Sequence, residues 1–264
     1  MTPVAIVTGA SAGIGTELAR VFARNGHALV LVARRKDRLD ALAREIAAAG
    51  RPAPLVLPLD LARSEAVERI AGALAAQGLE PQYVVNNAGF GLVGDAVDRE
   101  RSDLLDMIDL NVRALTDLSL AFADSLARHR GGILNVGSIA GFLPGPGSAV
   151  YYASKAYVLS LGEALHYEMR PRGVRVTTLC PGPVHTEFHL RAGFQSQKMP
   201  LLDVSAAQVA EDGYRGLMAG KRVVIPGLGN KLVTLLPRLL PRNLLLYLIG
   251  RRQRSRIKSP APRT

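Results

Sequence analysis

Short apolar segments alternate with longer segments of helical periodicity through most of this chain, and no other feature limits its fold as much. The helical segments carry an apolar residue every three or four positions, as residues 35–49 do with Leu39, Leu42 and Ile46. The apolar segments lie at residues 4–7, 28–33, 55–60, 83–85, 132–138, 174–180 and 223–226. Strands that alternate with helices at this spacing predict an α/β fold with a doubly wound parallel sheet. Ligands of such sheets bind beyond the carboxyl ends of the strands.

No linker or repeat divides the region that carries this pattern, so we expect a single domain over residues 1–227 and a C-terminal extension over 228–264. The distribution of charge agrees with this boundary. The net charge is +11, but residues 220–264 hold eleven Lys and Arg residues and no Asp or Glu. Basic and acidic residues are equal in number in the rest of the chain, so the basic character belongs to the C-terminal end.

The extension is rich in leucine as well as arginine, and three interpretations of it are open. In the first, which we rank highest, its leucines pack on the rest of the chain or across the subunit interface of a homo-oligomer, a dimer or tetramer. In the second, they lie on an anionic membrane surface, helped by the basic residues. Nucleic-acid binding ranks last because aromatic residues and a recognition motif are missing. Prolines and arginines interrupt its apolar runs well before the ~20 residues that a membrane-spanning helix needs.

The single cysteine, Cys180, excludes an internal disulfide and a cysteine-based metal cluster. The N-terminus carries no basic and apolar targeting signal, because the apolar run 4–7 is short and leads straight into glycines. We therefore expect a cytoplasmic protein, with membrane association through the extension as the open alternative.

A glycine-rich turn follows the first apolar segment and precedes the first helical one. Gly9, Gly13 and Gly15 have the spacing G-x-x-x-G-x-G. Glycines at such a turn let the backbone approach a pyrophosphate, whose charge lies at the helix N-terminus. The strand, turn and helix together predict a Rossmann fold and a bound dinucleotide, whereas the alternative is a turn needed only for packing.

The residues at the end of the second strand predict which dinucleotide binds. An acidic residue there would select NAD, but the chain has Arg34 and Arg35, and no acid before Asp37. Arginine suits a 2′-phosphate in charge and in its forked donors, so we predict NADP(H). Asp60 and Leu61, which close the third strand, are expected at the edge of the adenine.

Tyr151 and Lys155 lie four residues apart at the start of a long helical segment. Residues with this separation share one face of a helix, so the phenol and the ammonium can point into the same space. A nearby cation favours the phenolate and lowers a phenol pKa that starts near ~10. The pair is a candidate general acid/base, although a packed tyrosine and a solvated lysine would explain the pair equally well if it stood alone.

Taken in order, the motifs of residues 1–225 resemble those of the short-chain dehydrogenase/reductase family of compact single-domain type. Ser138 closes the fifth strand thirteen residues before Tyr151, a spacing typical of that family. The other matching segments are Thr8–Gly15, Asn86–Gly89, Leu110–Val112 around Asn111, Tyr151–Lys155 and Pro181–Thr186.

The resemblance implies hydride transfer between a nicotinamide and a carbonyl or alcohol, an NAD(P)-dependent oxidoreductase activity. It implies that Tyr151 protonates the carbonyl oxygen, that Ser138 donates a hydrogen bond to it, and that Lys155 binds the nicotinamide ribose and lowers the pKa of Tyr151. Asn111 is expected to hold a water that links Lys155 to solvent, and no metal is required. The implied cofactor-binding residues are Gly9, Ser11, Gly13, Ile14, Gly15, Arg34, Arg35, Asp60, Leu61, Asn87, Ala88, Gly89, Tyr151, Lys155, Pro181, Gly182, Val184 and Thr186.

The substrate pocket is expected to be lined by residues 90–92, 141–150 and 187–203, the last of them a mobile lid. These segments are mainly apolar and predict a hydrophobic carbonyl or alcohol substrate. The alternative of another class is a catalytically silent protein that binds NADP(H) as a sensor or scaffold. The presence of Asn111, Ser138, Tyr151 and Lys155 together favours the enzyme.

Overall fold

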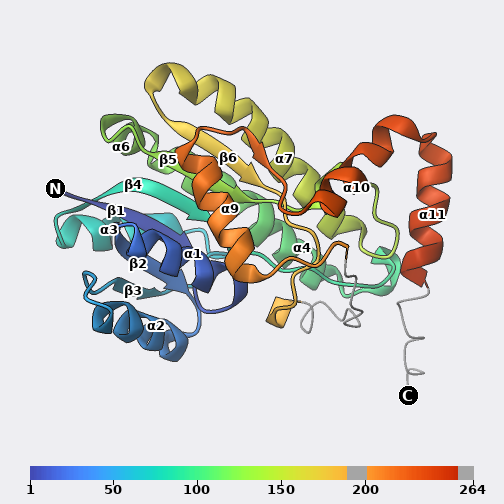
Figure 1. Ribbon diagram of the computed structural model, residues 1–264. Helices are drawn as coiled ribbons and strands as arrows, with labels where there is room; N and C mark the ends of the chain where they lie inside the picture. The colour runs from blue at the N-terminus through green and yellow to red at the C-terminus, as the bar shows by residue number, and fades with distance from the viewer. Residues whose placement is uncertain (189–200, 255–264) are drawn as a thin grey trace.

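Parallel strands of the described residues form one sheet in the order β3-β2-β1-β4-β5-β6-β7 (Figure 1). The computed structural model describes residues 1–188 and 201–254, without the side chains of Arg252 and Arg254. The strands are β1 Thr2–Thr8, β2 Ala28–Ala33, β3 Leu55–Pro58, β4 Leu79–Asn86, β5 Gly132–Val136, β6 Arg175–Leu179 and β7 Val223–Val224. Every neighbouring pair is parallel, so the predicted doubly wound sheet is confirmed.

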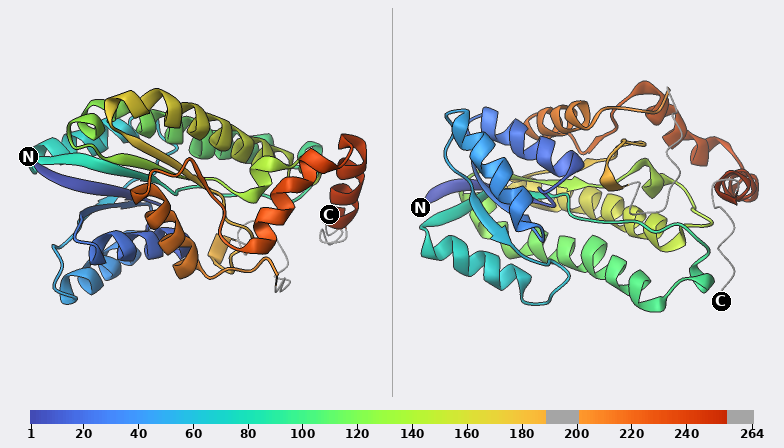
Figure 2. Two further views of the ribbon diagram at one scale, coloured as in Figure 1. Left: turned by 45° about the horizontal axis from the view of Figure 1, so that its top comes forward. Right: turned by 90° about the horizontal axis from the view of Figure 1, so that it is seen from below.

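Helices cover both faces of the sheet (Figure 2). The α-helices are α1 Gly13–Arg24, α2 Lys36–Ala48, α3 Ala66–Ala76, α4 Arg101–Ile108, α5 Leu115–Ala121, α6 Ala123–Arg128, α7 Ala149–Met169, α9 Ala206–Met218, α10 Leu228–Leu239 and α11 Arg242–Arg254. Short 3-10 helices are η1 Ala96–Asp98, η3 Ile139–Phe142 and η4 Arg170–Arg172, and η2 Asp109–Ala114 is a π-helix. The helical region between β4 and β5 is therefore divided into several pieces.

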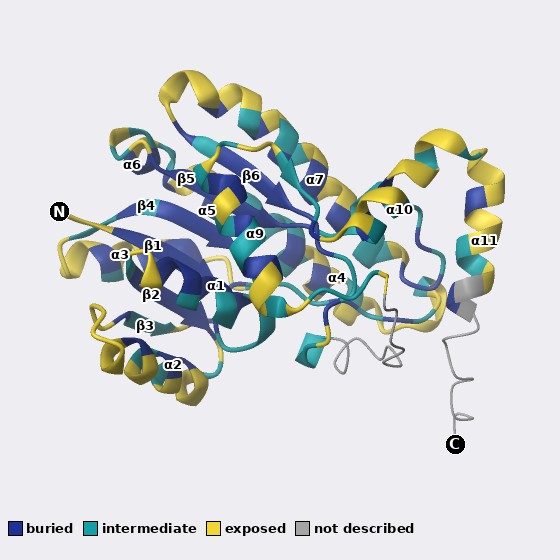
Figure 3. Cartoon of the chain, viewed as in Figure 1, coloured by how far each residue is buried: buried dark blue, intermediate teal, exposed yellow. Residues whose placement is uncertain are grey.

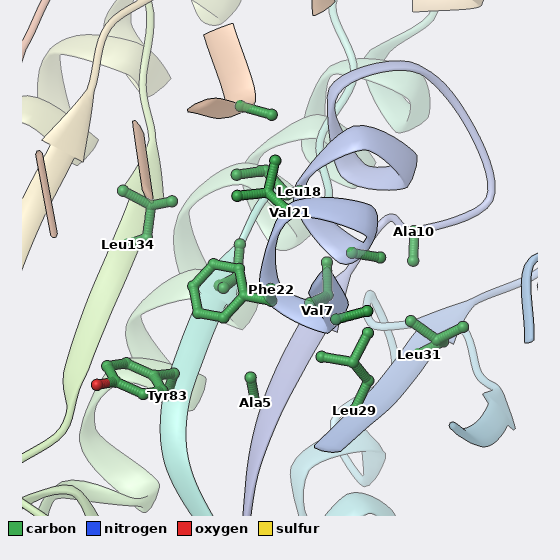
Figure 4. Packing of buried hydrophobic residues seen from close by; sticks show 14 of the residues in the cluster. Ala5, Val7, Ala10, Leu18, Val21, Phe22, Leu29, Leu31, Tyr83 and Leu134 are labelled. Carbon is green, nitrogen blue, oxygen red and sulfur yellow. The ribbon is translucent and has the colours of Figure 1, made fainter. Parts of the chain in front are cut away.

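Alternation of side chains along the strands produces two cores. Ala5 and Val7 of β1 pack with α1, α2 and α9, whereas Val4 and Ile6 pack with α3, α5 and α7 on the opposite face. Phe22 of α1 is fully buried in the first core and lies over the sheet beside Tyr83, with ring centroids 5.7 Å apart (Figure 4). Burial on both faces explains why these strands read as continuous apolar runs in the sequence.

The order of the strands reverses between β1 and β4. Crossovers to β2 and to β5 leave this point in opposite directions, so the loops that follow β1 and β4 separate and leave a crevice at the carboxyl edge of the sheet. The segments after β1, β2, β3, β4, β5 and β6 all begin at this edge, where we predicted the site.

The C-terminal extension forms α10 and α11 at the end of the molecule that is remote from the N-terminus (Figure 1). Most of its large apolar side chains are exposed (Figure 3). Leu245 is an exception, at 4% exposure. The part of our first interpretation in which the leucines pack on the rest of the chain is therefore wrong for most of them. The exposed ones are Leu228, Leu232, Leu235, Leu236, Leu239, Leu244, Leu246, Tyr247 and Leu248. Within the described residues, no helix combines the length and apolar character needed to cross a bilayer.

Candidate active site

A cavity of about 770 Å³ lies at the carboxyl edge of the sheet. Every predicted catalytic and cofactor-binding residue lines it except Gly15 and Asn111. Segments far apart in the sequence thus converge on one space, as the topology requires. The residue pattern and the strand order lead independently to the same site.

The glycine turn after β1 is held against the end of β4 by Asn87. Asn87 Nδ2 donates to the carbonyl oxygens of Thr8, at 2.9 Å, and Gly9, at 3.3 Å. Gly9 has a φ of +65°, and a Cβ there would lie 2.7 Å from Asn87 Nδ2. At Gly15, a Cβ would lie 2.3 Å from the carbonyl oxygen of Gly9. Glycine is thus required at Gly9 by backbone conformation and at Gly15 by close packing inside the turn.

The same turn meets the segment after β6. Gly13 has a φ of +57°, and a Cβ there would lie 3.0 Å from Thr186 Cγ2. Gly13 opens α1, so its backbone brings the positive end of that helix to the cavity. A narrow backbone cradle at a helix N-terminus, with Thr186 opposite, fits the pyrophosphate of a dinucleotide.

Two arginines follow β2, and they have different surroundings. The Arg34 side chain is 57% exposed, and its Nη1 lies 3.9 Å from Asp60 Oδ2. Arg35 is more buried and donates to Ser11 Oγ at 3.3 Å and to Glu187 Oε2 at 2.7 Å. Together they place positive charge beside the glycine turn, where the 2′-phosphate of NADP(H) is expected. Arg35 is therefore not a simply solvated side chain at a helix start.

Ser138, Tyr151 and Lys155 lie together on the cavity wall. Ser138 Oγ accepts a hydrogen bond of 3.1 Å from the backbone N–H of Ala140, which fixes the side chain at the start of η3. Lys155 Nζ donates 2.8 Å to the carbonyl oxygen of Val136 at the end of β5. It also lies 5.9 Å from the centroid of the Tyr151 ring. The i, i+4 spacing on α7 thus brings the phenol and the ammonium to the same place.

Burial governs the ionisation of this pair. Removal of water raises the pKa of Tyr151 well above the usual value for a phenol, and a hydrogen bond from Ser138 opposes the rise. Burial likewise lowers the pKa of Lys155 to about 8. The expected lowering of the Tyr151 pKa by Lys155 is wrong for this arrangement, because loss of solvation outweighs other influences on the phenol. Tyr151 is therefore held as a protonated phenol, the form that donates a proton.

Asn111 lies behind the cavity wall in the π-helical segment η2, with 1% exposure. Its Nδ2 donates to the carbonyl oxygen of Phe90 at 2.9 Å and to Ser154 Oγ at 3.1 Å, and its Oδ1 accepts from Phe90 N–H at 3.1 Å. A Cβ on Gly89 would lie 2.9 Å from Asn111 Oδ1 and 3.7 Å from Lys155 Nζ. Asn111 thus fixes the loop after β4 beside Lys155, while its role in holding a water stays a prediction. Single-turn π segments of this kind are frequent at functional sites.

The predicted substrate side is brought to the cavity in part. Phe90, Leu143, Phe188 and Leu202 line it, whereas Leu201 is 86% exposed. The greater part of the predicted lid, residues 189–200, lies outside the described residues. Of the apolar lining expected from residues 90–92 and 141–150, only Phe90 and Leu143 line the described part of the cavity.

Sequence reasoning missed the contribution of the extension to this cavity. Val233 of α10 and Ile249 and Gln253 of α11 line it. Leu245, Ile249 and Gln253 are four residues apart and form the inward face of α11. Leucines also occupy its other faces, so the sequence pattern does not show which face is buried. No local signal distinguishes a helix that closes a pocket from one that covers a subunit interface.

Comparison with known proteins gives matches over most of the chain. Residues 3–194 match the model of a protein family described as short chain dehydrogenase. A sulfoacetaldehyde reductase of Chromohalobacter salexigens is 39% identical over 217 residues, which cover 80% of this chain and 85% of that protein.

Two solved structures match almost the whole chain. A short-chain dehydrogenase from Sphingobium yanoikuyae in complex with NADPH has a TM-score of 0.78 and 33% identity, with coverage of 99% of this chain and 98% of the other. A bulky-bulky ketone specific alcohol dehydrogenase from Comamonas testosteroni has a TM-score of 0.73 and 29% identity, with coverage of 100% and 97%. These two matches therefore include the C-terminal extension.

Proposed function

This chain belongs to the short-chain dehydrogenase/reductase family, and from that premise we propose that it reduces the carbonyl group of hydrophobic ketones or aldehydes with NADPH, Tyr151 supplying the proton. The observation that carries the proposal is the position of Tyr151 on the cavity wall beside Ser138, where loss of solvation raises the pKa of the phenol and keeps it protonated. A protonated acid on the wall of a largely apolar cavity is suited to the reductive direction.

NADP(H) is the cofactor, in line with the NADPH complex of the Sphingobium yanoikuyae relative. When bound, NADPH supplies the hydride that the carbonyl carbon receives. The glycine cradle of Gly9 and Gly13 would hold the pyrophosphate, and Arg34 and Arg35 would hold the 2′-phosphate. The two arginines favour NADP(H) over NAD(H) through charge and through their forked donors.

The protein residues move the proton. The hydroxyl groups of Ser138 and Tyr151 hold the carbonyl oxygen, and Tyr151 O–H gives its proton to that oxygen as the carbon–oxygen double bond becomes single. The resulting phenolate is stabilised by the ammonium of Lys155, whose pKa of about 8 lets it pass a proton near neutral pH. Asn111, fixed beside Lys155, completes the proposed path to solvent.

The lining of the cavity supports a bulky, apolar substrate. Phe90, Leu143, Phe188, Leu202 and Ile249 present apolar surface to it. The Comamonas testosteroni relative is described as specific for bulky-bulky ketones, and it matches the full length of this chain. The sulfoacetaldehyde reductase, a relative whose name gives a small charged aldehyde, matches 80% of it. Bulky ketones are therefore the first class to test.

The test is NADPH consumption over bulky ketones, aldehydes, quinones and 3-oxoacyl thioesters. Tyr151→Phe is expected to lower kcat at least about 100-fold, the usual contribution of a general acid, with NADPH affinity within about twofold of wild type. Tyr167→Phe is the matched control on the same helix, since Tyr167 is 80% exposed. Absence of turnover on every substrate class would support the silent sensor instead. If Tyr152→Phe abolishes turnover and Tyr151→Phe does not, the general acid is Tyr152 and our assignment is wrong.

The extension is also proposed to join subunits through its exposed leucines. Leu232 and Leu239 are 66% and 74% exposed and lie seven residues apart on one face of α10. Exposed apolar surface of this kind marks a contact with another protein or with a membrane. The double variant Leu232→Gln, Leu239→Gln should lower the mass in solution if the face is a subunit interface. Unchanged mass with reduced binding to anionic liposomes would indicate peripheral membrane contact.

A further inference from the structure

The inward face of α11 forms part of the wall of the substrate cavity. Ile249 and Gln253, one helical turn apart, line the cavity, and Leu245 one turn earlier is buried. A Cβ on Gly250 would lie 3.7 Å from Pro146, so the helix is packed against the loop that precedes α7. The end of the chain therefore lies against the pocket, and its side chains contribute to the surface that a substrate meets.

Gln253 is a polar residue in this otherwise leucine-rich helix, and it is 5% exposed. Its Nε2 donates a hydrogen bond of 3.1 Å to the hydroxyl of Tyr152, which also lines the cavity. Its Oε1 is buried and has no hydrogen-bond partner in the part of the chain that the structure describes. A buried carbonyl oxygen without a donor is unfavourable, so a ligand that brings a donor to it binds more tightly.

Tyr152 connects this amide to the proposed catalytic acid. The rings of Tyr151 and Tyr152 meet edge to face, with centroids 6.1 Å apart. A substrate whose carbonyl lies at Tyr151 and whose body extends past Tyr152 would bring its remote end to Gln253. Apolar side chains such as Leu143 and Ile249 line the same cavity.

We propose that Gln253 and Tyr152 form a polar subsite that accepts a hydrogen bond from the substrate, so that the preferred substrates are bulky apolar ketones with a hydroxyl group remote from the carbonyl. The position of the substrate carbonyl at Tyr151 in this inference rests on the proposed carbonyl reduction. The subsite itself rests on the unpartnered amide oxygen. A site that hydrogen-bonds a substrate hydroxyl discriminates strongly against an analogue without it. An apolar site discriminates less, because adding or removing one methylene group changes the binding free energy only slightly.

The experiment compares two bicyclohexyl ketones, one with a hydroxyl group and one with a methyl group on the ring remote from the carbonyl. Wild-type enzyme is expected to show a kcat/KM for the hydroxyl ketone about tenfold above that for the methyl ketone, mainly through KM. Gln253→Met preserves the length of the side chain and removes the amide. It should reduce the preference to less than about twofold, because KM for the hydroxyl ketone rises more than KM for the methyl ketone.

Gln208→Met is the matched control, because Gln208 lies on α9, outside the lining of the cavity, and its amide donates to Asp212. It should leave the preference unchanged. The inference is overturned if wild type does not prefer the hydroxyl ketone. It is also overturned if Gln253→Met keeps the preference or loses activity on both ketones equally, as a displaced helix would.

A second readout separates this inference from the proposed function. The dissociation constants of both ketones are measured by calorimetry on NADPH-loaded Tyr151→Phe, with and without Gln253→Met. If wild type turns over neither ketone but the hydroxyl ketone binds about tenfold more tightly in a Gln253-dependent way, the proposed reaction fails and the subsite stands. Equal affinities of the two ketones refute the subsite even if both are reduced.

Discussion

Arg35 donates a hydrogen bond of 2.7 Å to Glu187, which ties the end of β2 to the segment after β6. A second arginine, Arg38, lies 3.6 Å from the other carboxylate oxygen of Glu187. Arg35 also bonds to Ser11 of the glycine turn. The Glu187 carboxylate thus lies among the positive charges where the 2′-phosphate of NADP(H) is expected, and the two anions compete for the same guanidinium group.

Glu187→Gln is expected to tighten NADPH binding about threefold to tenfold, because it removes a negative charge from the phosphate site. The affinity for NADH, which has no 2′-phosphate, should change less than twofold. Fluorescence titration of both cofactors measures the difference. Glu211→Gln, which breaks a comparable ion pair with Arg24 away from the cavity, is the control and should leave both affinities unchanged. Equal changes in the affinities for NADPH and NADH would contradict the proposed competition between Glu187 and the 2′-phosphate.

Arg34→Asp is expected to reverse the cofactor preference. It replaces the proposed donor to the 2′-phosphate by a negative charge that would repel the phosphate, beside Asp60. The ratio of kcat/KM for NADPH to that for NADH should fall about 100-fold, since hydrogen bonds to charged groups contribute about 1.5–3 kcal/mol. Steady-state kinetics with the two cofactors measures this ratio. The assignment fails if the wild-type enzyme already prefers NADH.

Lys155→Met should raise the free energy of unfolding at pH 7 by about 1–2 kcal/mol while it abolishes turnover. Burial lowers the pKa of Lys155 to about 8 from 10.5, and each unit corresponds to about 1.4 kcal/mol, partly offset by the lost donor to Val136. Below pH 8 the lysine is charged in both states, so the cost of burying its charge is fully present.

Between pH 8 and pH 10.5 the folded protein releases this proton before the unfolded chain does. The wild type should therefore gain stability relative to Lys155→Met over that range. Thermal denaturation of both proteins at several pH values follows the difference. A variant less stable than wild type at pH 7, or a difference independent of pH, would show that burial of the lysine is not destabilising.

Gly15→Ala should weaken NADPH binding at least about tenfold and destabilise the fold by about 1–3 kcal/mol, as overpacking does. A Cβ at this position would lie 2.3 Å from the carbonyl oxygen of Gly9 and 2.4 Å from Asn87 Nδ2, so the turn must shift. Gly72→Ala in α3 is the control, because among the described residues nothing beyond the adjoining turns of its own helix lies within 4 Å of the added Cβ. It should stabilise by about 0.5–1 kcal/mol. Similar effects of both variants, in denaturation and cofactor titration, would contradict the packing argument.

The parts of the site that depend on local sequence were predictable, and those that depend on burial were not. Gly9, Gly13 and the Tyr151–Lys155 spacing follow from strand, turn and helix geometry, which the pattern of apolar residues reveals. The shift in the pKa of Tyr151 was predicted in the wrong direction, because loss of solvation depends on the complete packing around the phenol. Gln253 escaped notice because a helix that joins the cavity from the end of the chain leaves no periodic signal of its own.

Because α11 supplies a wall of the pocket, the site combines segments that are synthesised at different times as well as segments that are far apart in the sequence. The cofactor turn after β1 leaves the ribosome well before Ile249 and Gln253 of α11. A nascent chain can therefore complete its sheet and its nucleotide cradle before the substrate pocket has its final shape. Changes in α11 can therefore alter the shape of the pocket while the residues that form the nucleotide cradle stay the same.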